Sequence, residues 1–163
     1  MSKFFDNLET RSDSERSNDI REQLPVQIKN AKDNSSAFSE ILKNINPEDV
    51  KSIEDLPKLP VLRKSELVQL QGKKPPLGGL IASSVQDLDQ IFQSPGPIYE
   101  PGMVKRDWWR SGRAVKAAGI GKGDIVQNCF SYHFTPAGML SEQGILAVGA
   151  TVFPAGTGQT ELQ

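Results

Sequence analysis

Cysteine and histidine are almost absent from this chain of 163 residues, which contains one of each, Cys129 and His133. A single cysteine excludes an internal disulfide framework and fits a reducing compartment. One histidine and one cysteine also argue against a transition-metal site within this chain. The sequence therefore predicts no metal-binding residue.

Neither sign of charge is in clear excess, because the chain has 19 basic and 20 acidic residues and a net charge of −1. Such a balance creates no field that would recruit nucleic acid or an anionic membrane, so neither partner is predicted. Long apolar runs are also missing. The most apolar stretch, residues 144–153, is too short to span a bilayer, and residues 1–6 lack the apolar core of a signal peptide. These absences predict a cytoplasmic protein.

The first part of the chain has the apolar periodicity of short helices. Pro25 interrupts the longest periodic stretch, which predicts a kink or break near Gln23 and Leu24. We expect, in order, a helix over residues 9–34, a helix over 36–44 capped by Ser35 or Ser36, helix starts at Asn46 and Ser52, an extended connector over 56–61, and a helix over 63–70. This pattern predicts a helical microdomain over residues 1–74.

The composition changes after the Pro- and Gly-rich stretch 73–81, which predicts a domain boundary and an incomplete α/β subdomain over residues 75–163. We expect two strands, over 89–92 and 98–100, that form a hairpin. A helix over 107–119 follows, with Trp109, Gly112, Val115 and Ala118 buried. After it we expect a buried strand over 125–130, a helix over 135–148, a strand over 150–154 and the start of a helix over 159–163.

Alternating helices and strands at this spacing predict right-handed parallel βαβ units, and therefore an α/β fold with a partial, mostly parallel sheet flanked by helices. Ligands of open α/β sheets bind at the carboxyl ends of the strands. Those ends lie at residues 130–134 and 154–160, where we expect a ligand site.

The turn over residues 94–101 has the setting of a phosphate loop, because it contains glycine, follows a strand and precedes an expected helix from about Lys105. Three of its residues are proline, and proline has no backbone N–H to donate to a phosphate. The turn also contains no lysine. Whether this turn binds phosphate is the main functional question that the sequence raises.

Several stretches resemble the phenylacetate–coenzyme A ligase family, part of the adenylate-forming acyl-CoA synthetase superfamily. They are residues 56–67, 124–138, 149–154 and 156–163. The resemblance covers nearly the whole chain and implies the start of the large domain of an adenylate-forming enzyme. It also implies ATP, Mg²⁺ and coenzyme A as cofactors, and a small aromatic or acyl carboxylate as the substrate.

The resemblance places candidate site residues in three groups. Ser94, Gly96 and the Tyr99 hydroxyl are the donors that remain at the position of the family's phosphate loop. Tyr132, His133 and Phe134 stand where relatives line the acyl pocket, and Gly156 and Thr157 stand in a turn that leads to the active-site helix. The family's later motifs, including its catalytic lysine, do not occur in these residues. We therefore expect an N-terminal fragment that does not complete the reaction alone, and assign no catalytic residue.

Alternatives remain open. The protein could be a non-catalytic relative that binds an acyl or aryl ligand, or an assembly module whose open sheet edge forms dimers. His133 is interpreted as a general base, a pocket wall or an ordinary strand-end histidine. Cys129 is expected to be an inert, buried thiol. The basic cluster Arg63, Lys64, Lys73 and Lys74 is either an anion site or a solvated helix face.

Overall fold

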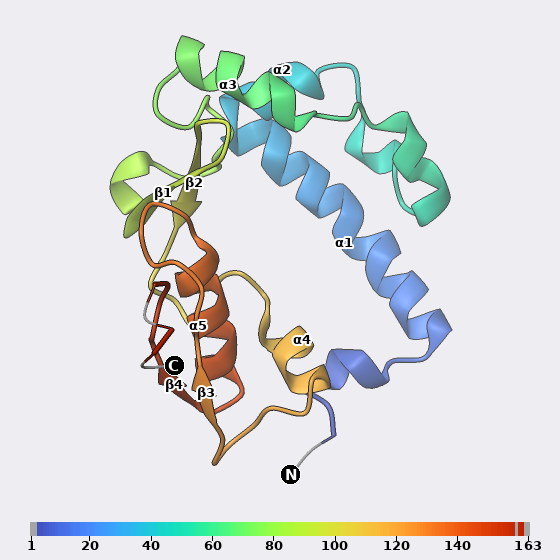
Figure 1. Ribbon diagram of the computed structural model, residues 1–163. Coiled ribbons are helices and arrows are strands. Elements are labelled where there is room, and N and C mark those ends of the chain that lie inside the picture. The colour runs from blue at the N-terminus through green and yellow to red at the C-terminus, as the bar shows by residue number, and fades with distance from the viewer. Residues whose placement is uncertain (1–2, 159, 162–163) are drawn as a thin grey trace. The chain divides into compact units, whose positions relative to one another are not determined.

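A computed structural model describes residues 3–158 and 160–161 of the chain. The chain divides into two compact units (Figure 1). The helical unit consists of residues 11–88 together with the short segment 96–99. The α/β unit consists of the residues up to Thr10, residues 89–95 and those from Glu100 onward. The domain boundary predicted between residues 74 and 75 stays a prediction.

The helical unit is built on one long helix, α1 (Asp13–Asn34). It begins later than expected, after a separate 3-10 turn, η1 (Asn7–Thr10), of the α/β unit, because Ser12 and Glu15 form a reciprocal capping box at its start. Of the kink or break predicted near Gln23 and Leu24, the break is wrong, since α1 continues through Pro25. Pro25 is buried, so packing within the unit offsets the backbone hydrogen bond that proline cannot donate.

Apolar residues from three segments form the core of the helical unit. Ile28 of α1, Leu42 and Val50 are buried together, and Val50 has no exposed surface. Leu24, Ala31, Phe38, Ile41, Ile45 and Leu59 pack around them. Leu42 follows α2 (Ser36–Ile41), where the Ser35 hydroxyl accepts a hydrogen bond from the Phe38 N–H at 3.3 Å. The predicted serine cap of this helix is therefore confirmed.

Short helical turns connect this core to the end of the unit. The predicted starts at Asn46 and Ser52 are confirmed as caps of two 3-10 helices, η2 (Pro47–Asp49) and η3 (Ile53–Lys58). The connector predicted over residues 56–61 is wrong in its first half. There η3 continues through Pro57, its fifth residue, and ends at Lys58. Next come α3 (Lys64–Lys73) and η4 (Val85–Asp87).

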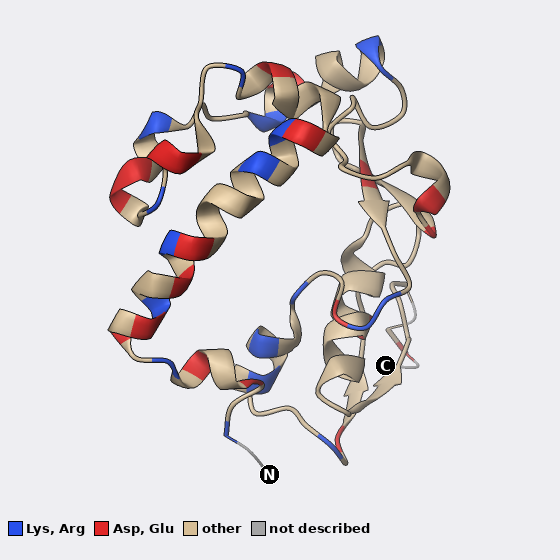
Figure 2. Ribbon diagram, turned by 180° about the vertical axis from the view of Figure 1, so that it is seen from behind, with Lys and Arg blue, Asp and Glu red and all other residues tan. Residues whose placement is uncertain are grey.

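Charged side chains of both signs alternate along α1 (Figure 2). Several pair within one turn, as in the contact between Lys29 and Asp33 and the 3.8 Å pair of Arg16 and Asp13. Such exposed pairs contribute little stability but keep this face of the helix solvated. No described helix is long and apolar enough to cross a membrane.

The α/β unit contains the first strand of a two-stranded sheet, β1 (Gln90–Ser94), whose partner β2 (Ile98–Gly102) follows after three residues. This short connection is that of a hairpin, so the predicted hairpin around residues 95–97 is confirmed. Phe92 of β1 packs against Trp109, with ring centroids 6.0 Å apart and planes tilted by 59°.

The helix predicted over residues 107–119 is much shorter. It is α4 (Gly112–Ala117), because Asp107 and Arg110 have φ angles of 53° and 57°, in the left-handed region that ends a regular helix. The Asp107 carboxylate instead accepts the Gly112 N–H at 2.8 Å and so satisfies the start of α4. Of the four residues predicted to be buried, Gly112 is buried and Ala118 is exposed. Gly119 has φ 89°, which confirms the glycine expected after this helix.

The last described elements form the predicted parallel βαβ unit. Strand β3 (Ile125–Gln127), helix α5 (Ala137–Ala147) and strand β4 (Thr151–Phe153) follow one another, and β3 pairs with β4 in parallel, Val126 opposite Val152. Figure 1 shows α5 beside these strands. The expectation of a buried strand over 125–130 is wrong, since Ile125 is 78% exposed. The mixed α/β class is confirmed, with two sheets of two strands among the described residues.

Candidate ligand site at the strand ends

Asn128 connects the segments that follow β3 and β4 in the α/β unit. It is 2% exposed and comes directly after β3. Its N–H donates to the Phe153 carbonyl at 2.8 Å, and its carbonyl accepts the Gly156 N–H at 3.0 Å. Its side-chain amide donates to the Gly138 carbonyl of α5 at 2.9 Å. One buried residue thus fixes both strand ends and the first turn of α5.

Tyr132 is held above the end of β3 by two hydrogen bonds. The Asn128 amide donates to its hydroxyl at 2.7 Å, and the hydroxyl donates to the Glu142 carboxylate of α5 at 2.8 Å. Burial raises the pKa of Tyr132 to about 12, aided by the hydrogen bond to Glu142 and its negative charge. The phenol is therefore neutral at physiological pH and acts as a fixed donor.

The two residues after Tyr132 are exposed in the described structure. Phe134 is 79% exposed, has φ 48°, and accepts the Gln93 N–H on its carbonyl at 2.7 Å. His133 is also exposed, and its N–H donates to the Ser131 hydroxyl at 3.2 Å. No hydrogen bond to the imidazole is found among the described residues, so no carboxylate orients it there as a general base.

The predicted turn after β4 lies against the same network. Gly156 has φ 68°, a conformation that favours glycine, and its N–H reaches Asn128. Thr157 next to it is exposed. The structure therefore brings Tyr132 and Gly156 together through Asn128, whereas His133, Phe134 and Thr157 point their exposed surfaces to solvent. The predicted helix over 159–163 lies largely outside the described residues.

A cavity of about 380 Å³ lies beside Asn128. Its walls are Val126, Gln127, Asn128, Cys129, Phe130 and Ser141. The predicted burial of Cys129 is wrong: β3 ends at Gln127, so the thiol lies beyond the strand and is exposed. Phe130 is 60% exposed and provides an aromatic wall. This cavity is the concave part of the strand-end site.

The proline turn between β1 and β2 has few donors for a phosphate. Pro95 and Pro97 provide no N–H, and the Tyr99 N–H donates to the Gln71 side-chain oxygen at 2.9 Å. The Gln71 amide also donates to the Tyr99 carbonyl at 2.7 Å. Gly96 has φ 131°, Ser94 is 8% exposed, and the Tyr99 residue is 43% exposed. Pro95, Pro97 and Tyr99 therefore offer no N–H to a phosphate, so the turn has few of the donors of a phosphate cradle.

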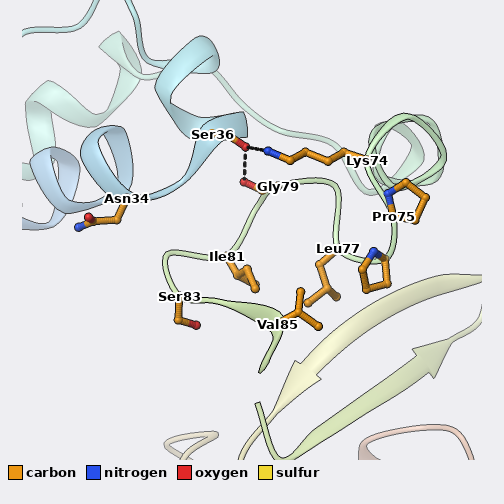
Figure 3. Close-up of a pocket in the computed structure, with 10 residues that line it drawn as sticks. Asn34, Ser36, Lys74, Pro75, Leu77, Gly79, Ile81, Ser83 and Val85 are labelled. Atoms are coloured by element: carbon orange, nitrogen blue, oxygen red, sulfur yellow. Dashed lines mark hydrogen bonds between the residues drawn. The ribbon is translucent and has the colours of Figure 1, made fainter. Parts of the chain in front are cut away.

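The basic cluster predicted around α3 places one lysine at a second cavity, of about 270 Å³, in the helical unit (Figure 3). The Lys74 ammonium donates to the Ser36 hydroxyl at 2.6 Å, and that hydroxyl lies 3.5 Å from the Gly79 carbonyl. A Cβ atom at Gly79 would collide with the Ser36 hydroxyl. The Lys74 side chain thus joins α2 to the loop that follows α3. No group of three metal-ligating side chains is found among the described residues.

Comparison with known proteins identifies the relatives of this chain. It is 30% identical to the phenylacetate–coenzyme A ligase of Pseudomonas putida over 98% of the chain, and 28% identical to that of Aromatoleum evansii over 87%. The chain is a distant homologue of the phenylacetate–coenzyme A ligases. It spans 37% and 33% of the length of these two relatives. No protein-family model matches it.

Solved structures of a related ligase have the same fold. A 2-hydroxyisobutyryl-CoA ligase in complex with 2-HIB-AMP and CoA superposes with a TM-score of 0.82 over 96% of this chain and 35% of that chain, at 21% identity. In its postadenylation state the same ligase matches with a TM-score of 0.77. The described fold is therefore that of the N-terminal third of an adenylate-forming CoA ligase.

Three residues important in this homologue of the phenylacetate–coenzyme A ligases were not singled out from the sequence, although each left a signal. Asn128 is an amide in the apolar run 125–130, and Glu142 is the one charged residue of α5. Gln71 lies four positions after Leu67, on the same face of α3, and is 7% exposed. A polar residue is unexpected on such a buried face.

Proposed function

We propose that this chain provides the acid-binding part of an ATP-dependent acyl- or aryl-coenzyme A ligase. Such an enzyme adenylates a small carboxylate and then transfers the acyl group to the coenzyme A thiol. The distant homology to phenylacetate–coenzyme A ligases supports the reaction class. In this proposal, β3 and β4 begin the larger, mostly parallel sheet of the ligase fold.

The network around Asn128 is the observation on which the proposal rests. It lies at the carboxyl ends of two parallel strands, where open α/β sheets bind ligands. Asn128 fixes Tyr132 on one side and Gly156 on the other, beside the 380 Å³ cavity. A cavity that has the Phe130 ring on one wall and the Asn128 amide on another suits a small acid with an apolar body.

The chain's own residues would divide the work of binding. The Tyr132 ring is a fixed wall of the acyl site because its hydroxyl is held by Asn128 and Glu142. His133 and Phe134 flank it with exposed rings, and Gly156 and Thr157 border the opposite side. ATP with Mg²⁺ would supply the activating phosphoryl chemistry, and coenzyme A the thiol. In this proposal Ser94, Gly96 and the Tyr99 hydroxyl are the groups of this chain that would contact the phosphates of ATP, and no step is assigned to the cofactors.

A second candidate function is the binding of an acyl or aryl acid without adenylation. The observation that favours it is the proline turn: Pro95 and Pro97 cannot donate, and the Tyr99 N–H is bonded to Gln71. A relative that has lost its phosphate loop can retain an acid site at the strand ends.

Pyrophosphate release separates the two functions. The full-length protein that carries this chain, rather than these 163 residues alone, is incubated with ATP, Mg²⁺, coenzyme A and a panel of aryl and acyl acids, while calorimetry measures ATP binding in parallel. Turnover with any acid supports the ligase. Acid binding without turnover or ATP binding supports the second function. Absence of acid binding contradicts both, and Tyr132→Phe should weaken acid binding wherever it occurs, with Tyr99→Phe as the matched control.

A further inference from the structure

A cavity of about 540 Å³ lies in the α/β unit, on a different side of α5 from the strand-end site. This volume is well within the range of small-molecule sites. The cavity is bounded by one face of α5, which contributes residues at helical spacing, and by the segment before α4. The α5 residues are Met139, Glu142, Gln143 and Leu146. Ser141, which lines the strand-end cavity, lies on another face of this helix.

The polar groups of this cavity are unevenly satisfied. Both ends of the Gln143 side chain are bonded, since its amide donates to the Met103 carbonyl at 2.8 Å and its oxygen accepts the Trp108 N–H at 3.2 Å. In contrast, the Gln90 side-chain oxygen is buried and has no hydrogen-bond partner among the described residues. A buried acceptor without a donor is costly, and a ligand that carries a hydroxyl or N–H would satisfy it.

The charges of the cavity favour an anion. Two cationic residues, Lys105 and Arg106, and one carboxylate, Glu142, line the cavity, and Glu142 already accepts the Tyr132 hydroxyl at 2.8 Å. Arg106 donates to the Ala147 carbonyl at 2.6 Å. The Lys105 ammonium has no ion pair or hydrogen bond with another described residue. Such an ammonium beside apolar walls is suited to a single carboxylate.

We propose that this cavity binds a monocarboxylate with an apolar body and a hydrogen-bond donor. Lys105 pairs with the carboxylate, Val104, Met139 and Leu146 contact the apolar body, and Gln90 accepts the donor. Because Glu142 lines this cavity and also holds Tyr132, an occupant contacts a residue of the strand-end site. The site is distinct from the proposed acid site and does not depend on adenylation.

Three probes test each part of this assignment by calorimetry without ATP. They are 4-hydroxyphenylacetate, phenylacetate, which lacks the donor, and 2-(4-hydroxyphenyl)ethanol, which lacks the charge. The first should bind best, and each of the others should lose about tenfold in affinity, the loss expected for one hydrogen bond or ion pair in a cavity. Equal binding of the acid and the neutral alcohol overturns the proposal, whatever the variants do.

Variants locate the binding. Lys105→Met should reduce affinity for both acids and leave the neutral alcohol unchanged, whereas Gln90→Leu should reduce 4-hydroxyphenylacetate to the affinity of phenylacetate. Leu146→Trp fills the cavity from an exposed position and should abolish this binding, while Lys64→Met in the helical unit is the control. Circular dichroism checks the fold. If Lys105→Met and Leu146→Trp bind like the parent, the acid occupies another site and the proposal is wrong. Failure of pyrophosphate release leaves this result unaffected.

Discussion

Asn128 makes side-chain and main-chain hydrogen bonds that no other amino acid would reproduce together. Asn128→Ala removes the bonds to the Tyr132 hydroxyl and the Gly138 carbonyl from a residue that is 2% exposed. We expect a loss of about 1–3 kcal/mol in the free energy of unfolding, measured by urea denaturation. Gln127→Ala, at the neighbouring exposed position, should stay within about 0.5 kcal/mol. A similar small effect at Asn128 would contradict its role as the connecting residue.

Tyr132 provides a test through its titration. Its pKa is raised to about 12, so the folded state holds this proton more tightly than the unfolded state, where the pKa is 10.0. The stability from this group is therefore complete below pH 10 and is lost as the pH rises toward 12. Glu142→Gln should lower the pKa of Tyr132, because it removes the negative charge that opposes phenolate formation.

Phenolate absorbance measures this titration, and the difference between the parent protein and Tyr132→Phe assigns it. Glu142→Gln keeps a side-chain oxygen that can accept the Tyr132 hydroxyl, so it tests charge rather than shape. If Tyr132 titrates at the same pH in the parent protein and in Glu142→Gln, the charge of Glu142 does not stabilise the neutral phenol, and burial alone explains the raised pKa.

At the scale of elements, α1 contains a proline that its packing tolerates. Pro25 removes one backbone hydrogen bond from the helix interior, a defect that costs about 3 kcal/mol in exposed helices. Pro25→Ala should therefore raise the free energy of unfolding, by about 1 kcal/mol after the loss of buried surface is subtracted. Urea denaturation followed by circular dichroism measures the change. A destabilised variant would show that the proline ring contributes more by packing than it costs.

The proline turn between β1 and β2 leads to a prediction about ATP binding. Pro95→Ser with Pro97→Thr returns two N–H donors to the turn and leaves the Tyr99–Gln71 pair in place. If the site has lost its phosphate, ATP affinity in calorimetry should rise by about tenfold for each donor that reaches a phosphate oxygen. Unchanged or weaker ATP binding would argue that the turn never faces the nucleotide.

These elements show how far the sequence predicts the fold. Caps at Ser35, Asn46 and Ser52 were predicted because they depend on neighbouring residues alone. The sequence does not predict the late start of α4, because the left-handed backbone conformation of Asp107 and Arg110 depends on contacts that local propensity does not encode. The site was predicted in outline from the strand ends, whereas the Asn128 and Gln71 hydrogen bonds join residues far apart in sequence.

On the scale of the whole molecule, the β3–β4 sheet has unpaired outer edges among the described residues. Ile125 is 78% exposed and Phe153 is 53% exposed on these strands. Open edges with apolar side chains favour pairing with another strand, so we propose, as the alternative to their continuation into a larger ligase sheet, that two copies of the chain dimerise there. Sedimentation should show association that increases with concentration and is reduced by Ile125→Lys. The control is Val61→Lys in the helical unit, and a monomer at every concentration would contradict the proposal.

The exposed Cys129 has a practical consequence for studies of this protein. Because it is the single cysteine of the chain, a thiol-reactive dye or spin label would attach at one place without any prior mutation. That place is the wall of the 380 Å³ cavity beside Asn128. The natural sequence therefore already contains a reporter whose signal would change when the strand-end site is filled.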